Sequence, residues 1–366
     1  MTNVDAVVAG AGVWGCTVAR TLAESGRRVL VLERRAAAGG NARCETDAET
    51  GIEVHLYGSH IFHTHNEAVW RFVNRFVEFN GYQHKVLARR KGKTYFLPIG
   101  LALVNGFFGV DLAPGELDGF LADESRKRAL FDAFIRGYTS KQWGRPPEEI
   151  DPAIIRRVPV RSSWDVNYFN DVRQGIPRTG YNSLFERLLD HPNVTVETNR
   201  AFALADLGAF GPGVSVYYSG PLDALFDFRF GHLPWRTLRF ERETLATADF
   251  QGTSVVNYVE SEVPYTRIHE FKHYHPEGRI DGTWGFDAPK TVIMREYSAA
   301  WRPGDEPYYP VDTPESRALA DRYRAEAAKF PNLVVGGRLG EYRYYDMDQS
   351  IARGLEAAGG GEGGAT

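Results

Sequence analysis

The sequence has few cysteines and no long apolar run, and each shortage excludes a class of protein. Only Cys16 and Cys44 occur among 366 residues, too few for a disulfide framework or a cysteine-based zinc site. No apolar stretch reaches the roughly 20 residues of a membrane-spanning helix. Asp5 and the glycines from Gly10 to Gly15 interrupt the N-terminal apolar run, which argues against a signal peptide. We therefore expect a cytoplasmic globular protein.

Neither sign of charge is in large excess. The chain has 43 Lys and Arg against 47 Asp and Glu, a net charge of -4, which argues against a non-specific nucleic-acid binder but leaves room for a local basic cleft. Aromatic residues are abundant, with 18 Tyr and 22 Phe. The length exceeds that of a usual single domain, so we expect two or three lobes.

Hydrophobic spacing predicts that the chain begins with a βαβ unit and continues into helices. Strands are expected over 5–9 and 28–32 with a helix over 13–24 between them. Apolar residues at helical spacing predict two further helices, over 67–79 and 125–138.

A different pattern follows in the second half of the chain. Short β-rich runs at 194–197, 214–218, 253–258 and 291–297 predict a largely antiparallel sheet. A helix over 317–329 and a buried parallel strand over 332–337 come next, and Asp346 is placed to cap a last helix. The glycine-rich end, 359–366, is expected to be disordered.

A glycine-rich loop lies between the first strand and the first helix. Gly10, Gly12 and Gly15 form the G-x-G-x-x-G pattern, in which the turn, the close approach to a pyrophosphate and the helix packing each require a glycine. Glu33 ends the second strand, where a carboxylate can accept hydrogen bonds from a ribose. The Gly39–Gly40 pair suits a second close approach, which favours FAD over a dissociating nicotinamide cofactor.

Five further motifs resemble those of bacterial UDP-galactopyranose mutases. They are GIEVHLYGSHIFHT (51–64), GYTSKQWG (137–144), VPYTRIHEF (263–271), DEPYYPV (305–311) and GGRLGEYRYYDMDQ (336–349). The resemblance implies an α/β fold with a Rossmann-like FAD-binding domain, a small helical lobe and a mostly antiparallel β-sheet domain. The FAD domain is expected to be discontinuous, over 1–78, 194–233 and 313–358. The helical lobe with its substrate lid is expected over 100–156, and the sheet domain over 79–99, 157–193 and 234–312.

The resemblance also implies a reaction without net redox change. In that family, N5 of the reduced flavin attacks the anomeric carbon of UDP-galactopyranose, and UDP leaves and returns after the sugar ring has reclosed as the furanose. This implies FAD, reduced by NAD(P)H or another reductant, and a nucleotide-sugar substrate, UDP-galactose. It also implies a place in cell wall polysaccharide biosynthesis.

The motifs assign candidate site residues by their match to the family. Catalytic roles fall to Arg157 and Arg267, which match diphosphate-binding arginines, and to His63, placed against the flavin. Arg156 and Arg161 lie near enough to Arg157 to exchange that assignment. The substrate-binding set is Tyr138, Trp143, Tyr168, Asn257, Tyr309, Tyr344, Asp346 and His84. The cofactor-binding set is Gly10, Gly12, Val13, Trp14, Gly15, Glu33, Arg34, Gly40, Asn41, His60, Arg338 and Met347.

Several alternatives stay open from the sequence. A metal site at the histidines near His60 and His63 is disfavoured, since the segment is broken by glycine and shows no fixed carboxylate partner. The chain is shorter than relatives between Phe108 and Phe134, the lobe that carries their subunit contact, so a homodimer stays open. The alternatives in function are a mutase for a different nucleotide sugar, an amine-oxidase-like flavin oxidoreductase, and a sugar-nucleotide binding protein that keeps FAD as a structural ligand.

Overall fold

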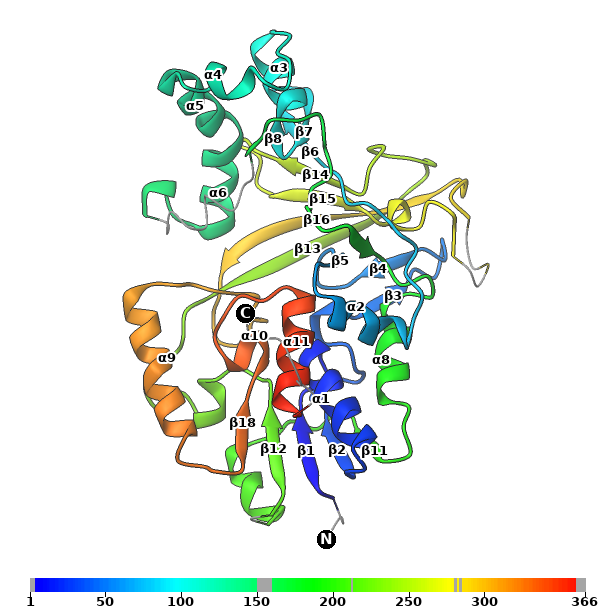
Figure 1. Cartoon of the computed structure of the whole chain (residues 1–366), viewed down its shortest axis with the longest axis vertical. Coiled ribbons are helices and arrows are strands. Elements are labelled where there is room, and N and C mark those ends of the chain that lie inside the picture. The colour runs from blue at the N-terminus through cyan, green and yellow to red at the C-terminus, as the bar shows by residue number, and fades with distance from the viewer. Residues whose placement is uncertain (1–3, 150–159, 212, 280–281, 283–284, 360–366) are drawn as a thin grey trace.

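Two sheets and a group of helices follow one another along the long axis of the molecule (Figure 1). The computed structural model describes residues 4–149, 160–211, 213–279, 282 and 285–359. A parallel sheet lies at the bottom of the view, a long twisted sheet crosses the middle, and helices α3 to α6 lie at the top. This α/β arrangement agrees with the fold class that the motifs implied.

The parallel sheet has five strands in the order β11-β2-β1-β12-β18. Both of its faces are buried, because alternate residues of β1 pack on opposite sides: Val8 lies with helix α1, and Val7 lies against Leu207 and Val216. The strands are β1 (Ala6–Ala9), β2 (Val29–Leu32), β11 (Val194–Glu197), β12 (Ser215–Tyr218) and β18 (Leu333–Val335). Helices α1 (Val13–Glu24), α8 (Tyr181–Leu189) and α11 (Met347–Ala357) pack together at this sheet.

Three strands of this sheet correct the sequence expectations. The runs at 194–197 and 214–218 were expected in an antiparallel sheet, but β11 and β12 pair in parallel with β2 and β1. The strand expected over 332–337 is parallel, yet β18 is an edge strand and only half-buried. A short β-rich run does not reveal its partner, which explains both errors.

The second sheet has seven strands in the order β17-β13-β16-β15-β14-β6-β7. It is antiparallel except where β14 runs parallel to β6. Its strands are β6 (Val86–Arg90), β7 (Lys93–Leu97), β13 (Trp235–Leu245), β14 (Val255–Tyr258), β15 (Arg267–Glu270), β16 (Thr291–Ala300) and β17 (Tyr309–Pro310). Three two-stranded pairs complete the strands: β3 (Cys44–Thr46) with β4 (Glu53–His55), β5 (Phe62–Thr64) with β10 (Arg173–Gly175), and β8 (Ile99–Gly100) with β9 (Val160–Arg161).

The helices at the top of Figure 1 lie beyond the β6–β7 edge of the second sheet. They are α3 (Leu101–Phe108), α4 (Leu117–Phe120), α5 (Glu124–Leu130), a π-helical turn (Phe131–Ile135) and α6 (Arg136–Trp143). The helix expected over 125–138 is therefore real but contains a π-helical turn. The helix expected over 67–79 is shorter, since α2 (Glu67–Asn74) ends five residues earlier and the chain turns.

The C-terminal part returns to the parallel sheet. Helix α9 (Pro314–Ala327) begins at the N-cap Thr313, and the short α10 (Gly337–Gly340) precedes α11. Asp346 is the N-cap residue of α11, and its N–H donates to Gln349 Oε1 at 3.0 Å, as a capping box requires. Of the tail expected to be disordered, 359–366, the structure describes Gly359, whose N–H donates to the carbonyl oxygen of Glu356 at 3.0 Å, and 360–366 lies outside the described residues. The division of the chain into three domains stays a prediction.

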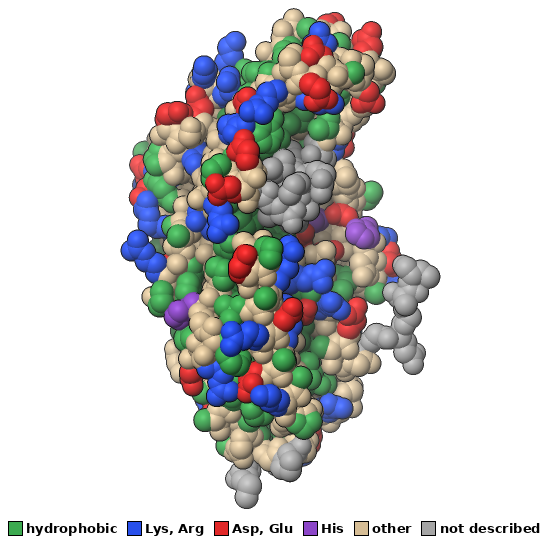
Figure 2. Space-filling view, turned by 90° about the vertical axis from the view of Figure 1, so that its left-hand side faces the viewer, with side chains coloured by type: hydrophobic (Ala, Val, Ile, Leu, Met, Phe, Trp, Pro, Cys, Tyr) green, Lys and Arg blue, Asp and Glu red, His purple; other side chains and the backbone are tan. Residues whose placement is uncertain are grey.

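Charges of both signs are interspersed on the face shown in Figure 2. Across the described residues, no helix is both long enough and apolar enough to span a membrane.

Candidate active site between the two sheets

The glycine loop makes an open turn at the carboxyl end of β1. Gly10 has φ +104°, and a Cβ on it would lie 2.3 Å from Ser219 Oγ. A Cβ on Gly15 would lie 1.9 Å from the carbonyl oxygen of Gly10. The first and third glycines are therefore required by the backbone itself, as the motif predicted. Helix α1 has no side-chain cap and no acidic residue in its first turn, which leaves its N–H groups to an anion.

A cavity of about 220 Å³ opens at this turn. Gly40 provides the second close approach, because a Cβ there would lie 2.9 Å from Gly12 Cα. Gly15 packs behind the turn and does not line the cavity. The predicted cofactor residues that do line it are Gly10, Gly12, Val13, Trp14, Glu33, Arg34, Gly40, Asn41, His60, Arg338 and Met347.

Glu33 is buried at the edge of this cavity and already has two partners. Its Oε2 accepts from the N–H of Ala11 and its Oε1 from that of Arg35, both at 2.8 Å. Each carboxylate oxygen has a second lone pair, so the side chain keeps room for a ribose hydroxyl while it fixes the loop. Arg34 lies at the mouth, where Nη2 is 2.6 Å from Glu306 Oε1.

A larger cavity of about 850 Å³ lies between the parallel sheet and the seven-stranded sheet. Asn41, His60, Arg338 and Met347 line both cavities, so the two adjoin. The predicted site residues that line the larger cavity are His63, His84, Tyr138, Trp143, Tyr168, Asn257, Arg267, Tyr309, Tyr344 and Asp346. The structure therefore brings together residues that are up to 283 positions apart.

Arg267 enters the larger cavity from β15 and is held by a buried carboxylate. Its Nε lies 3.3 Å from Oε1 of Glu296, and its Nη2 contacts the hydroxyl of Tyr138. Burial would raise the pKa of Glu296, but the charge of Arg267 and the hydrogen bonds from His269 and Thr266 lower it to about 2. Glu296 is therefore a fixed anion beside a fixed cation.

Aromatic rings surround this ion pair. Tyr309 stacks on Tyr344 with ring centroids 5.9 Å apart, and the guanidinium of Arg338 lies 4.9 Å from the centroid of Tyr344. Burial raises the pKa of Tyr138 and of Tyr309 well above the ordinary value, so both keep their phenolic protons and can donate hydrogen bonds.

Helix α6 is fastened to the seven-stranded sheet, and this places Tyr138 and Trp143 at the cavity. Lys141 Nζ donates to the carbonyl oxygens of Tyr258 at 2.6 Å, Tyr265 at 2.9 Å and Val263 at 3.0 Å. Arg236 Nε on β13 donates to the carbonyl oxygen of Gln142 at 2.9 Å. Helix α6, which was predicted to carry a substrate lid, is therefore docked on the sheet in this structure.

The histidines of the 55–65 segment have different surroundings. His63 stacks on Phe169 with centroids 3.7 Å apart, and its Nδ1 lies 2.7 Å from Asp171 Oδ2. The expectation that no carboxylate is fixed near these histidines is therefore wrong, because β5 and the loop before β10 meet only in the folded chain. His63 lines only the larger cavity, whereas His60 lines both cavities.

Burial keeps two of the histidines at the cavity uncharged. It lowers the pKa of His60 to about 4 and that of His84 to about 3, with the nearby charge of Arg338 or Arg267 adding to the effect. Both rings are therefore neutral near pH 7 and serve as hydrogen-bonding groups rather than cations.

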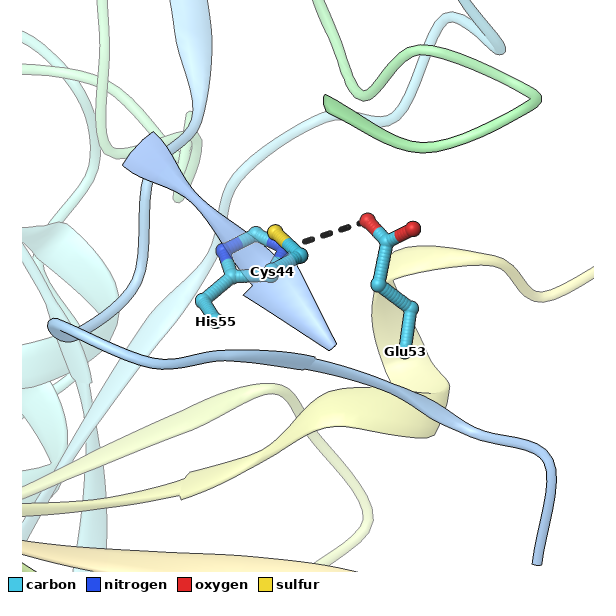
Figure 3. Close-up of side chains that lie close together, drawn as sticks. All are labelled: Cys44, Glu53 and His55. Atoms are coloured by element: carbon cyan, nitrogen blue, oxygen red, sulfur yellow. Dashed lines mark ion pairs between the residues drawn. The ribbon is translucent and has the colours of Figure 1, made fainter. Parts of the chain in front are cut away.

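Two clusters of side chains have the composition of a metal site. Cys44, Glu53 and His55 lie together in the core (Figure 3), but Arg279 Nη1 is 3.1 Å from Glu53 Oε2, and His55 Nδ1 accepts from the N–H of His60. Glu53 and His55 therefore already bind other groups of the protein. Asp249, Glu270 and His273 form the second cluster, away from both cavities.

One predicted catalytic residue cannot be placed. Arg157 and its neighbour Arg156 lie outside the described residues. Arg161 is described and does not line the larger cavity; its Nη1 lies 3.1 Å from Asp165 in its own loop. The structure gives no support for moving the assignment from Arg157 to Arg161.

Sequence reasoning missed residues that support the site from the second sheet and from loops. They are Glu296, Asp171, Phe169, Lys141 and Arg236. None of the five has a signal in a local sequence pattern, since Glu296 lies opposite Arg267 only through the register of β15 and β16. Asp171 and Phe169 depend on the loop before β10. Lys141 on α6 and Arg236 on β13 depend on how this helix packs on the sheet.

Several comparisons with known proteins match this chain to the same family. A family model described as UDP-galactopyranose mutase matches residues 133–344, and one described as NAD(P)-binding Rossmann-like domain matches 8–76. A "Probable UDP-galactopyranose mutase" of Klebsiella pneumoniae is 38% identical over 98% of this chain and 94% of its own length. The chain belongs to the UDP-galactopyranose mutase family. A member of this family is an isomerase.

Two further matches to this UDP-galactopyranose mutase family member are a curated relative and a solved structure. The "dTDP-fucopyranose mutase" of Escherichia coli is 37% identical over 96% of this chain and 97% of its own length. A crystal structure of reduced UDP-galactopyranose mutase aligns with a TM-score of 0.74 at 16% identity, covering 98% of this chain and 93% of that chain, which shows a shared fold.

Proposed function

We propose that this protein is a FAD-dependent mutase that interconverts UDP-galactopyranose and UDP-galactofuranose. The observation that carries the proposal is Arg267, a cation fixed by Glu296 and ringed by tyrosine hydroxyls, in a cavity that adjoins a dinucleotide cavity. A guanidinium and phenolic donors suit a diphosphate, the charged part of the substrate and the leaving group of the reaction.

FAD fits the smaller cavity by the residues that line it. The open N-terminus of α1 and the glycines of the loop would take the pyrophosphate, and Glu33 a ribose. When bound and reduced, for example by NAD(P)H, the flavin supplies a nucleophile, N5, for the anomeric carbon, with no net oxidation of the sugar.

The chain's own residues bind and orient the nucleotide sugar. Arg267, with Arg157 as its proposed partner, holds the diphosphate and stabilises the charge that develops as the bond to the anomeric carbon breaks. Tyr138 and Tyr309 are protonated donors for phosphate oxygens, and Tyr344 lines the same cavity. Trp143 offers an aromatic face to the base.

The direct test follows the sugar nucleotide itself. Purified FAD-loaded protein is incubated with UDP-galactofuranose, with and without dithionite, and the products are separated by chromatography. We expect UDP-galactopyranose only from reduced protein, with far less than one equivalent of reductant consumed per turnover. Stoichiometric consumption of NAD(P)H would instead indicate an oxidoreductase, and binding without turnover a binding protein.

A second candidate substrate is a dTDP-linked 6-deoxy sugar. The observation that favours it is the near-equal identity to the dTDP-fucopyranose mutase of Escherichia coli. The same assay with dTDP-fucopyranose and dTDP-fucofuranose decides between them. We expect the preferred substrate class to show a kcat/KM at least about tenfold higher, because the two classes differ in both the base and the 6-hydroxyl.

A further inference from the structure

A chain of polar side chains links the loop beside the cofactor cavity to Arg267. Ser59 Oγ lies 2.5 Å from His269 Nδ1, and His269 Nε2 lies 3.0 Å from Glu296 Oε2. Glu296 Oε1 in turn lies 3.3 Å from Arg267 Nε. Ser59 is at the start of this chain, between Gly58 and His60, and all three line the larger cavity.

The direction of each hydrogen bond follows from the groups involved. The carboxylate of Glu296 can only accept, so His269 Nε2 carries a proton and donates it. His269 is fully buried, and burial lowers its pKa, so the ring is neutral and Nδ1 is an acceptor. The hydroxyl of Ser59 must then donate to Nδ1, while Ser59 Oγ accepts from the hydroxyl of Tyr274.

This order fixes the carboxylate that holds Arg267. His269 donates to Oε2 of Glu296, and the Thr266 hydroxyl shares its one proton between Oε1 at 3.1 Å and the carbonyl oxygen of Glu296 at 3.0 Å. His269 therefore holds one oxygen of the carboxylate, and the other oxygen lies beside the Nε edge of Arg267. The Nη2 end of the guanidinium then contacts Tyr138 at the cavity.

We propose that Ser59 is a positioning residue for Arg267, acting through His269 and Glu296, so that the loop beside the cofactor cavity sets the affinity for a nucleoside diphosphate. This inference rests on the proposed function, because it takes Arg267 to bind the diphosphate. Loss of the Ser59 hydroxyl leaves the buried Nδ1 of His269 without its donor, which loosens the ring and with it the carboxylate.

The test measures UDP affinity and needs no turnover. Ser59→Ala, Ser59→Thr and the native protein are loaded with oxidised FAD and titrated with UDP by calorimetry, with dTDP as a second probe. We expect the Kd of the Ala variant to rise about fivefold, and that of the Thr variant, which keeps a hydroxyl, to stay within about twofold of native. FAD content should not change.

A double-mutant cycle shows whether Ser59 acts through Arg267. In an Arg267→Lys background, Ser59→Ala should change the UDP Kd by less than about twofold, because the guanidinium it positions is gone. Thr291→Val is the matched control: it removes a fully buried hydroxyl that donates to Glu270 at 2.7 Å in the same sheet, outside the cavities. It should lower stability and leave UDP affinity unchanged.

The possible results separate this inference from the proposed function. An equal effect of Ser59→Ala in both backgrounds would mean a purely structural role and would overturn the inference. Failure of native protein to bind either UDP or dTDP would overturn it as well. Coupling in the cycle without mutase turnover would support the inference and reject only the proposed reaction.

Discussion

At the scale of single residues, the site depends on charges that are fixed before a ligand arrives. Arg267 and Glu296 are both largely buried, and removing two charges from water costs about as much as their attraction returns. The pair therefore adds little to stability, but it holds a guanidinium in one orientation inside the cavity. Such preorganisation lowers the cost of binding an anion.

Replacing Arg267 should reduce both nucleotide affinity and turnover. Arg267→Ala removes a charged partner of the diphosphate and leaves Glu296 as an unpaired buried anion, which should cost about 2 to 5 kcal/mol of transition-state stabilisation. Arg267→Lys should recover only part, since a point charge cannot make paired hydrogen bonds. Turnover, UDP affinity and flavin content are measured for each variant, and Arg157→Ala is expected to behave like Arg267→Ala.

A neighbouring arginine provides the control for Arg267. Arg295 lies on β16 and pairs with Glu243 at 2.8 Å on the outer side of the same sheet, so Arg295→Ala should leave turnover unchanged. Near-normal turnover in the Arg267 variants would reject the diphosphate site. Loss of flavin from them would show that Arg267 supports the cofactor instead.

Replacing Glu33 should weaken FAD retention. Glu33→Ala removes the proposed ribose acceptor and the two backbone contacts that shape the loop, and each lost hydrogen bond to a charged group is worth about 1.5 to 3 kcal/mol. We expect the Kd for FAD to rise at least about tenfold, as measured by titration of apoprotein. Glu306→Ala, a carboxylate at the mouth of the same cavity, should have a much smaller effect. Equal effects would show that Glu33 does not contact the ribose.

Which residues lie at the site was easier to predict than which side chains they contact. Apart from Gly15, the predicted site residues that the structure describes line one or both cavities, and their roles stay predictions. Glu296 and Asp171 were missed because their roles depend on strand register and on loops that meet in space. Neither leaves a trace in a local pattern.

At the scale of elements, helix α6 connects the top helices to the sheet that carries Arg267. Gly137 allows its close approach, since a Cβ there would lie 2.3 Å from the carbonyl oxygen of Val259. Lys141 then satisfies three carbonyl oxygens at the end of the β14–β15 connection. The position of Tyr138 against Arg267 follows from this docking.

Removing the Lys141 ammonium should loosen the lid and impair catalysis without loss of FAD. Lys141→Met keeps the length of the side chain but leaves three carbonyl oxygens without their donor. We expect kcat/KM to fall about tenfold, mainly through KM, and limited proteolysis near α6 to become faster. Lys127→Met on α5, where the side chain is 51% exposed and pairs only with Glu124, is the control. Unchanged KM for the sugar nucleotide would contradict the role of α6 as a lid.

The hydrophobic pattern predicted elements formed by local contacts well, but it did not predict which strands pair in a sheet. Helix α1 matches its predicted bounds, because its spacing and the glycine turn before it are local features. The β-rich pattern alone placed β11 and β12 in the antiparallel sheet, whereas the family resemblance assigned 194–233 to the FAD-binding domain. The pattern failed because β2 lies more than 160 residues before β11, and β1 more than 200 before β12. Long-range pairing is set by the whole fold.

At the scale of the whole molecule, the space between the sheets is lined and supported by neutral histidines. Burial lowers the pKa of His55, His60, His84 and His269 below the ordinary value of 6.5. They come from the 55–60 segment, from the loop just before β6 and from β15, so segments far apart in the sequence all carry a buried histidine with a lowered pKa. Protonating any of them would place an additional charge in the core, where burial disfavours it.

The protein should therefore lose stability as the pH falls from 6.5 towards 4. Below pH 6.5 the unfolded chain binds protons at these histidines while the folded chain does not, until the pH approaches the folded values of about 4 for His60 and about 3 for His84. Because the unfolded state binds more protons, the free energy of unfolding rises with pH across this window, with a slope approaching about 1.4 kcal/mol per pH unit for each histidine.

Urea unfolding at pH 7, 6 and 5 measures this slope, above the pH range where Glu296 with its pKa of about 2 contributes. His84→Gln should reduce the slope by one histidine's share, whereas His65→Gln, whose side chain is 91% exposed, should not change it. An unfolding free energy that stays constant from pH 7 to pH 5 would contradict the neutral histidine core.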